Sequence, residues 1–228
     1  MEAVARQLHG LNFEFFYGTD KDSLDMEQAK TQGLYSQEGY EKYYKKPSTI
    51  SKGMLSCALG HVKIYEDIVQ NGYQRTLILE DDAIPIGTAL HLFPFLTASL
   101  PQDWELLYLG YEKNELNGFA QKLKRMAYMT WPSHAKLKLS RKIYSHYYPD
   151  TLSENIARAG FHDCTHAYAV TLGAAKKLLP MQTPVVLNPD NLLAFACTTD
   201  IIKGYIVRPK LFKQLSAFEG SLASLTGD

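Results

Sequence analysis

The sequence predicts an α/β fold with a mostly parallel central sheet flanked by helices. Short runs of β-forming residues, such as 76–79 and 165–170, alternate with segments whose apolar residues recur every three or four positions. Strands that alternate with helices in this way are typical of a largely parallel sheet. The 228 residues are most simply one domain with a substantial core. The 24 basic and 24 acidic residues balance, so net charge gives no indication of nucleic-acid binding.

The elements follow from local signals. In the first half we expect a helix over 2–9, a strand over 12–17, a helix over 52–70, a strand over 76–79, a helical segment near 87–99 and a strand over 105–109. The second half adds a strand over 165–170, helices over 172–179 and 189–196, and a strand over 205–207. Ser51 is placed to cap the helix over 52–70, and Gly72 is placed to end it. Pro180 closes one later helix and Pro189 opens the next.

Three consecutive acids, Glu80, Asp81 and Asp82, follow the apolar strand over 76–79. Open α/β sheets place their sites at the carboxyl ends of strands. Clustered carboxylates repel one another unless a cation compensates, and Mg²⁺ and Mn²⁺ prefer such oxygen ligands. Side chains alternate along a strand, so Glu80 and Asp82 could share a face while Asp81 points away, and which pair of these acids binds the metal is left open. The sequence therefore predicts a metal site here, the alternative being a solvated acidic turn.

Several blocks, in this order, carry a resemblance to a known family. They are 51–61, 79–82, 165–168, 173–179, 189–190, Pro209 and Gln214. Over about residues 1–215 the chain resembles glycosyltransferase family 25, the lipooligosaccharide galactosyltransferase type with relatives among animal collagen glycosyltransferases. The resemblance implies a GT-A-like fold and a hexose, galactose, moved with inversion from a UDP-sugar. The implied acceptor is a lipooligosaccharide or lipopolysaccharide core.

The resemblance also implies roles for residues. Asp82 and Glu80 would bind a divalent metal, Mn²⁺ or Mg²⁺, and Glu80 or Asp81 would contact the donor's ribose or sugar. Inversion needs a carboxylate to take the acceptor's proton, and Asp190 is the candidate, with Asp163 in reserve. The alternative for Asp190 is an early-turn acid favoured by the helix dipole.

Four more residues are expected to bind the donor. Lys52 and Gly53 begin a helix, where free N–H groups attract a diphosphate, although a simple cap explains them equally well. Thr165 and His166 match a family block and would contact the donor, whereas His61 is more typical of a structural histidine.

A basic segment over 121–149, within an expected insertion over about 113–160, contains seven cations and no acid. Aromatic residues are interleaved with these cations, a combination that can meet an anionic surface. We therefore expect peripheral contact with the inner membrane face, the alternative being a solvated helix pair. Three widely separated cysteines and no run of ~18 apolar residues are typical of a cytoplasmic protein.

The N-terminal strand that usually opens family members is expected to be missing, because the chain begins inside what should be the following helix. The tail over 216–228 is expected to be weakly ordered. Two other classes of function stay open: a non-catalytic, glycosyltransferase-like binding protein, and a metal-dependent phosphoester hydrolase built on the same acids. Titrating UDP with and without Mn²⁺ distinguishes these classes.

Overall fold

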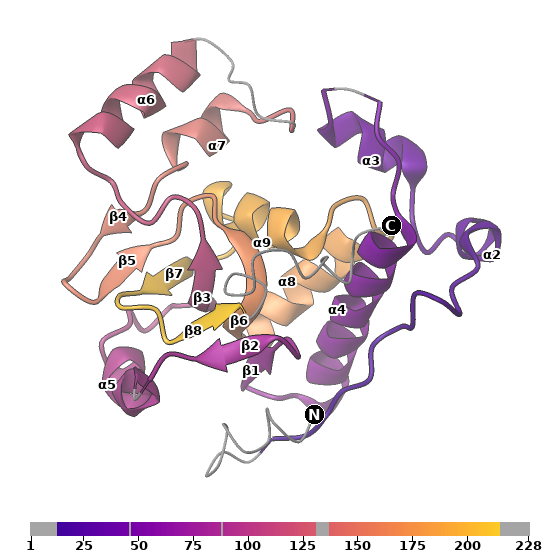
Figure 1. Ribbon diagram of the computed structural model, residues 1–228, viewed down its shortest axis with the longest axis horizontal. Coiled ribbons are helices and arrows are strands. Elements are labelled where there is room, and N and C mark those ends of the chain that lie inside the picture. Colours follow the sequence, from indigo (N-terminus) through magenta and orange to yellow (C-terminus); the bar gives the residue numbers. More distant parts are fainter. Residues whose placement is uncertain (1–12, 46, 88, 131–136, 215–228) are drawn as a thin grey trace.

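The computed structural model describes residues 13–45, 47–87, 89–130 and 137–214. These residues form an α/β fold in which a six-stranded mixed sheet is flanked by helices (Figure 1). The predicted fold class is thus confirmed. The helix expected over 2–9 and the tail over 216–228 lie outside the described residues.

The direction of the strands differs from the expectation. In order across the sheet lie β1 (Arg75–Leu79), β6 (Asp163–Thr171), β3 (Leu106–Glu112), β7 (Gly204–Val207), β5 (Ile156–Arg158) and β4 (Asp150–Thr151). β3 and β7 run parallel, whereas the other four pairings in this sheet are antiparallel. The expected mostly parallel sheet is therefore corrected to a mixed one. Alternation of strands and helices does not fix the direction of each strand. β6 begins where β1 and β3 end, so it runs antiparallel to both.

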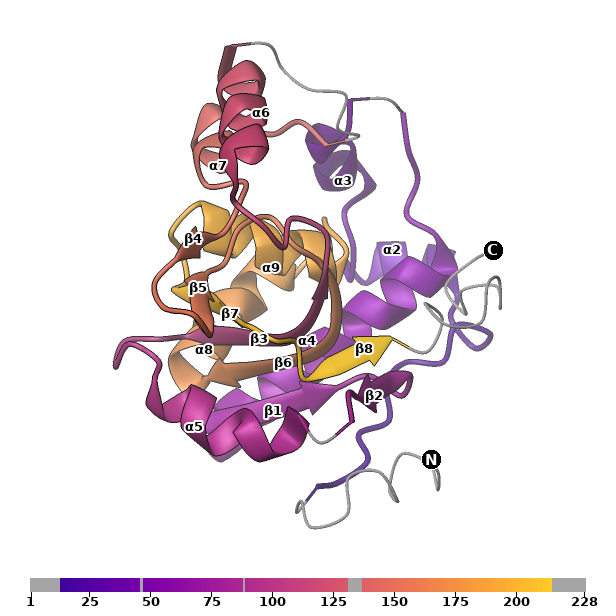
Figure 2. The ribbon, with the colours of Figure 1, turned by 60° about the vertical axis from the view of Figure 1, so that its left-hand side comes forward.

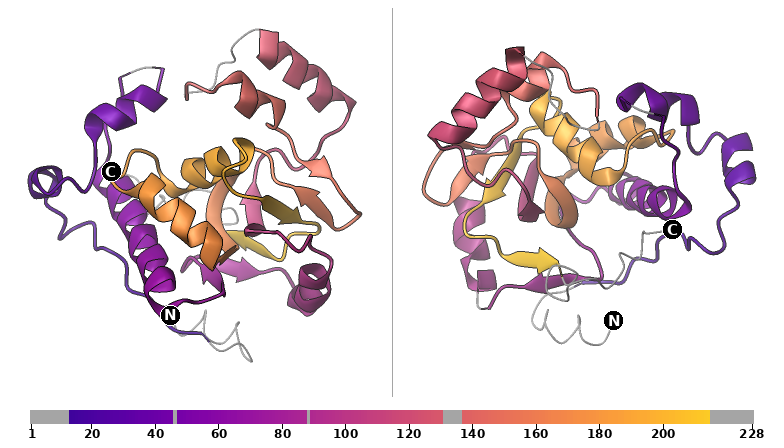
Figure 3. Two further views of the ribbon diagram at one scale, coloured as in Figure 1. Left: turned by 180° about the vertical axis from the view of Figure 1, so that it is seen from behind. Right: turned by 45° about the horizontal axis from the view of Figure 1, so that its top comes forward.

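Each face of the sheet has its own core. On one face, α4 (Lys52–Asn71), α8 (Leu172–Gln182) and α9 (Pro189–Thr198) pack on alternate strand residues such as Tyr108 and Tyr168. On the other face, η1 (Ala89–Leu92) and α5 (Phe93–Ala98) pack on the intervening residues, such as Leu107 and Leu109. Figure 3 shows the three helices of the first face grouped on one side. The period-two alternation of β3 thus explains why its residues are buried on both faces.

The local signals at both ends of α4 and at the start of α9 are confirmed, whereas α9 continues to Thr198, two residues past its expected end. The Ser51 side chain accepts the Met54 N–H at the start of α4, and Gly72 ends the helix with φ 70°. Asn188 caps α9 and Pro189 occupies its first turn. α8 continues past Pro180 to Gln182, so the end expected there is wrong by three residues.

Other elements lie around this body. A small sheet pairs β2 (Ala83–Pro85) with β8 (Phe212–Gln214), and short helices α2 (Met26–Thr31) and α3 (Gln37–Tyr43) precede α4. Helices α6 (Phe119–Thr130) and α7 (Arg141–Ser145) stand away from β1, β2 and α5 (Figure 2).

The strand expected over 12–17 is wrong for the residues described, because residues 13–17 have no regular secondary structure. Their aromatic side chains favour a strand, but no strand of the described chain pairs with them. No helix of the described residues is long and apolar enough to cross a bilayer.

Candidate active site

Residues that the sequence separates by more than 80 positions meet where β1 ends. Leu79 lies opposite Ala167 in the antiparallel register, and the Glu80 N–H donates to the His166 carbonyl oxygen at 2.9 Å. This register places the first residues of β6, Thr165 and His166, beside the acidic end of β1. The pairing therefore brings together Glu80, Thr165 and His166, all three of which the sequence singles out.

Glu80 is held in place from two sides. The Thr165 hydroxyl donates to Glu80 Oε1 at 2.6 Å, and His61 Nε2 lies 3.6 Å from the same oxygen. Burial alone would raise the pKa of Glu80, but His61 and the Thr165 hydroxyl more than offset it and leave the pKa below its ordinary value. Glu80 is thus an oriented, ionised carboxylate, and one of its oxygens is already committed to protein partners.

His61 takes a larger part than the sequence indicates. Its Nδ1 lies 2.7 Å from the hydroxyl of Tyr168, which in turn lies 3.1 Å from the Tyr65 hydroxyl. All three side chains are buried. The tyrosine pair fixes the imidazole so that its other nitrogen faces Glu80.

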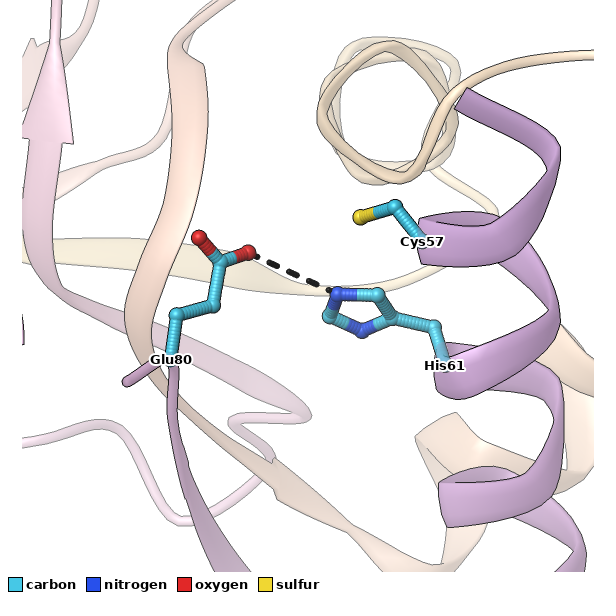
Figure 4. Close-up of side chains that lie close together, drawn as sticks. All are labelled: Cys57, His61 and Glu80. Carbon is cyan, nitrogen blue, oxygen red and sulfur yellow. Dashed lines mark ion pairs between the residues drawn. The ribbon is translucent and has the colours of Figure 1, made fainter. Parts of the chain in front are cut away.

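A further ligand group, which the sequence analysis missed, lies beside these residues. Cys57 and His61 extend from successive turns of α4 toward Glu80 (Figure 4). Their ligand atoms and a Glu80 oxygen all lie within 4.8 Å of one another, and no other trio of Cys, His, Asp or Glu does so within the described ranges. The four-residue spacing of Cys57 and His61 on a predicted helix was the available signal. We call this trio the thiol–imidazole–carboxylate group.

The donors in this group differ from those that the sequence predicts. Thiolate and imidazole suit Zn²⁺, whereas Mg²⁺ and Mn²⁺ prefer oxygen. Burial, together with the charges of Glu80 and Asp190, raises the pKa of Cys57 to about 12, so the thiol is protonated at neutral pH. A metal bound here must therefore displace a proton from sulfur.

Asp82 lies in the turn between β1 and β2. Its Oδ1 is buried and has no hydrogen-bond partner among the described residues. Burial raises the pKa of Asp82, the charges of Glu80 and Asp81 add to this, and a Gln214 hydrogen bond opposes it. An unpartnered carboxylate oxygen close to other carboxylates fits a hard divalent cation. Asp81, in contrast, is exposed.

Asp190 reaches the same region from the first turn of α9. Its Oδ2 accepts the Cys164 backbone N–H at 3.3 Å. Burial raises the pKa of Asp190, and the charge of Glu80 raises it further. The reserve candidate, Asp163, instead forms an ion pair with Lys113. Asp190 is thus a buried carboxyl group with a raised pKa, whereas Asp163 is paired with a cation, and the base role of Asp190 stays a prediction.

His166 has a buried ring, and neither ring nitrogen has a hydrogen-bond partner of good geometry within the described chain. Burial lowers the pKa of His166, against the opposing effects of the Phe212 carbonyl and nearby carboxylates, so the ring is neutral. Gly110 makes room for this ring, because a Cβ at that position would lie 2.1 Å from His166 Nε2.

Lys52 and Gly53 occupy the first turn of α4, as expected. The Lys52 side chain is exposed and makes no hydrogen bond or ion pair with the described residues. The expected contact of both residues with a diphosphate stays a prediction.

The fold and this edge define an α/β protein with clustered carboxylates at the end of a strand. The family model described as glycosyltransferase family 25 (LPS biosynthesis protein) matches residues 1–193. The chain therefore belongs to glycosyltransferase family 25, as its sequence motifs predict.

Curated relatives agree with this assignment. A glycosyltransferase 25 family member of Anopheles gambiae is 28% identical over 185 residues, which are 80% of this chain and 26% of that protein. Procollagen galactosyltransferase 1 of Danio rerio is 31% identical over 101 residues, 42% of this chain and 16% of the relative. A probable inactive glycosyltransferase 25 family member 3 of Rattus norvegicus is 31% identical over 94 residues, 40% and 16% of the two chains. The chain thus spans about a quarter or less of each of these relatives.

Proposed function

We propose that the protein is an inverting glycosyltransferase. It would move a hexose, galactose, from a UDP-sugar to a lipooligosaccharide or lipopolysaccharide core acceptor at the cytoplasmic face of the inner membrane. The observations that carry this proposal are contacts at the start of β6 and the end of β1. Asp190 accepts the Cys164 N–H, the next residue Thr165 donates to Glu80, and two residues beyond Glu80 an Asp82 oxygen is buried without a partner among the described residues. Family membership and the galactosyltransferase names among the relatives support the reaction and the sugar.

Asp82 and Glu80 are the residues proposed to hold a divalent ion, Mn²⁺ or Mg²⁺. When bound, such an ion supplies a positive charge that stabilises the departing diphosphate. Thr165 and His61 hold Oε1 of Glu80, which leaves Oε2 as the oxygen proposed to bind the ion. Asp81 and His166 border the same edge and are proposed to contact the donor's ribose or sugar.

Asp190 is proposed to act as the base. As the acceptor oxygen bonds to the anomeric carbon and the bond to UDP breaks, Asp190 Oδ takes the hydroxyl proton. A pKa raised by burial and by the charge of Glu80 suits this role, because a stronger base accepts the proton more readily. Inversion follows because acceptor and leaving group lie on opposite faces of the sugar.

Product analysis tests the proposal. Purified protein would be incubated with Mn²⁺, a panel of UDP-hexoses and a core oligosaccharide, and the products identified by mass spectrometry. We expect a glycan lengthened by one hexose from UDP-galactose, with β configuration by NMR, and its loss in Asp190→Asn. Release of free sugar or phosphate at the same rate without acceptor would instead indicate a hydrolase. UDP binding without any transfer would indicate a non-catalytic binding protein, as the name of the rat relative suggests for that protein.

A further inference from the structure

Helix α6 presents a stripe of large apolar side chains to solvent. Phe119 is 79% exposed, Met126 65% and Leu123 51%. Their spacing of three and four residues places them on one face of the helix. Leu116, just before the helix, and Met129 extend the exposed apolar surface. A soluble protein ordinarily buries a stripe of this kind, so its exposure calls for a partner.

The opposite face of α6 is anchored to the protein. The Tyr128 ring packs against Tyr144 and Tyr147, with ring centroids 5.6 Å and 6.0 Å apart. Arg125 donates to the Ser145 carbonyl at 3.3 Å and lies 3.8 Å from an Asp150 oxygen. These contacts fix the rotation of the helix about its axis. The apolar stripe therefore faces outward because the polar and aromatic contacts already occupy the inner side.

Cations lie near the stripe. Lys122 borders the stripe, Lys124 lies further round the same helix, and Arg141 begins the neighbouring helix α7. None of these three side chains forms a hydrogen bond or ion pair with the part of the chain that the structure describes. The sequence from 121 to 149 contains no acid. The surface thus combines an apolar centre with nearby cations that have no counter-charge among the described residues.

We propose that α6 lies in the plane of an anionic bilayer as a membrane-binding helix. Phe119, Leu123 and Met126 would enter the boundary between headgroups and acyl chains, and the flanking lysines would meet lipid phosphates. Interfacial helices of this kind combine an apolar face with cationic residues elsewhere on the same helix. A protein groove would match the apolar stripe alone, whereas an anionic lipid surface matches the stripe and the cations together.

The position of α6 relates this surface to the catalytic edge. The segment that leads from β3 into α6 is tied down at that edge, where Lys113 pairs with Asp163 and the Asn114 side chain donates to the Phe161 carbonyl. Both views show α6 as an outlying element beside α7 (Figures 1 and 2). Docking α6 on a membrane would hold the catalytic edge near lipid-linked acceptors. This last step rests on the proposed function, whereas lipid binding itself does not.

Vesicle binding tests the proposal. The protein would be sedimented with vesicles of phosphatidylcholine alone and of phosphatidylcholine with phosphatidylglycerol, at low and high salt. We expect binding to the anionic vesicles only, weakened as salt screens the lysines. Phe119→Ser should weaken it about tenfold or more, since a buried phenylalanine contributes strongly to transfer from water. Phe95→Ser is the matched control, because Phe95 is also exposed, at 60%, but lies on α5.

Either of two results would overturn the proposal. One is equal vesicle binding by wild type and Phe119→Ser, and the other is no binding of wild type to anionic vesicles, which would leave a protein partner as the occupant. Circular dichroism would establish that the variants are folded. Turnover of a water-soluble acceptor would be measured in parallel. If Phe119→Ser loses vesicle binding but still turns over the water-soluble acceptor, the membrane contact is separate from catalysis. The proposed function fails only if wild type does not turn over the water-soluble acceptor.

Discussion

The hydrogen bond from Thr165 to Glu80 can be removed with almost no change of shape. Thr165 is buried on β6, and Thr165→Val keeps a β-branched side chain of similar volume. The variant loses a 2.6 Å hydrogen bond to an ionised carboxylate. We expect the free energy of unfolding to fall and Glu80 to lose its fixed orientation.

The magnitude follows from the charge and exposure of Glu80. A hydrogen bond to a charged group contributes about 1.5–3 kcal/mol. The Glu80 side chain is 29% exposed, so water replaces part of the lost interaction. The lower end of the range, about 1.5 kcal/mol, is therefore expected, with a fall in Tm of roughly 3–6 °C for a domain of this size.

The loss should also depend on pH. The pKa of Glu80 is lower in the folded protein than its ordinary value of 4.5, so its ionised form contributes stability above pH 4.5 that is lost as pH falls through the folded pKa. A protonated Glu80 accepts a weaker hydrogen bond from the Thr165 hydroxyl than an ionised Glu80 does. The difference between Thr165→Val and wild type should thus be largest at neutral pH and shrink in acid.

Urea unfolding of wild type and two variants measures the effect. Thr76→Val is the matched control, because Thr76 lies on the neighbouring strand β1 and its hydroxyl is buried without a partner among the described residues. We expect this control to be neutral or stabilising. Equal stability of the two variants at neutral pH would refute the hydrogen bond. A loss that is the same at every pH would show that ionised Glu80 is not the acceptor.

Three further outcomes are expected. Asp190→Asn should abolish transfer yet stabilise metal-free protein at neutral pH. The pKa of Asp190 is raised in the folded protein, so wild type loses stability as pH rises through that pKa, and the urea midpoints of wild type and Asp190→Asn should converge in acid. Persistent transfer activity in Asp190→Asn would exclude Asp190 as the base. Zn²⁺ should inhibit Mn²⁺-dependent turnover by occupying the thiol–imidazole–carboxylate group. Cys57→Ser should relieve this inhibition, whereas the control Cys164→Ser should not. Equal inhibition of the two variants would contradict the assignment. Gly110→Ala should cost about 1–3 kcal/mol by crowding a buried imidazole, whereas Gly173→Ala, whose Cβ would have no neighbour nearer than 3.6 Å, should be tolerated.

Local signals in the sequence were sufficient for several elements. Ser51 and Gly72 predict both ends of α4, because capping and a left-handed terminus depend only on nearby residues. The acids after an apolar run correctly place Glu80 at the end of β1. The edge at which Thr165 joins Glu80 was also anticipated in part, since the family motifs single out both residues.

Long-range arrangement could not be predicted in the same way. The direction of β6 depends on the path of residues 113–162, and no periodicity along one strand encodes the orientation of its neighbour. The same limit applies to Cys57, which the sequence presents as an ordinary buried thiol until α4 turns it toward Glu80. The aromatic run at 13–17 misleads for a related reason, because strand propensity needs a pairing partner to be realised.

Isothermal titration of UDP with and without Mn²⁺, on wild type and Asp82→Asn, tests the central claim most directly. The substitution is nearly isosteric and replaces one oxygen of a carboxylate whose buried oxygen has no partner among the described residues. We predict Mn²⁺-dependent binding of UDP by wild type and its loss in Asp82→Asn, with unchanged circular dichroism. UDP binding that is equally tight in Asp82→Asn, or independent of Mn²⁺ in wild type, would contradict a nucleotide-sugar site built on this acidic strand end.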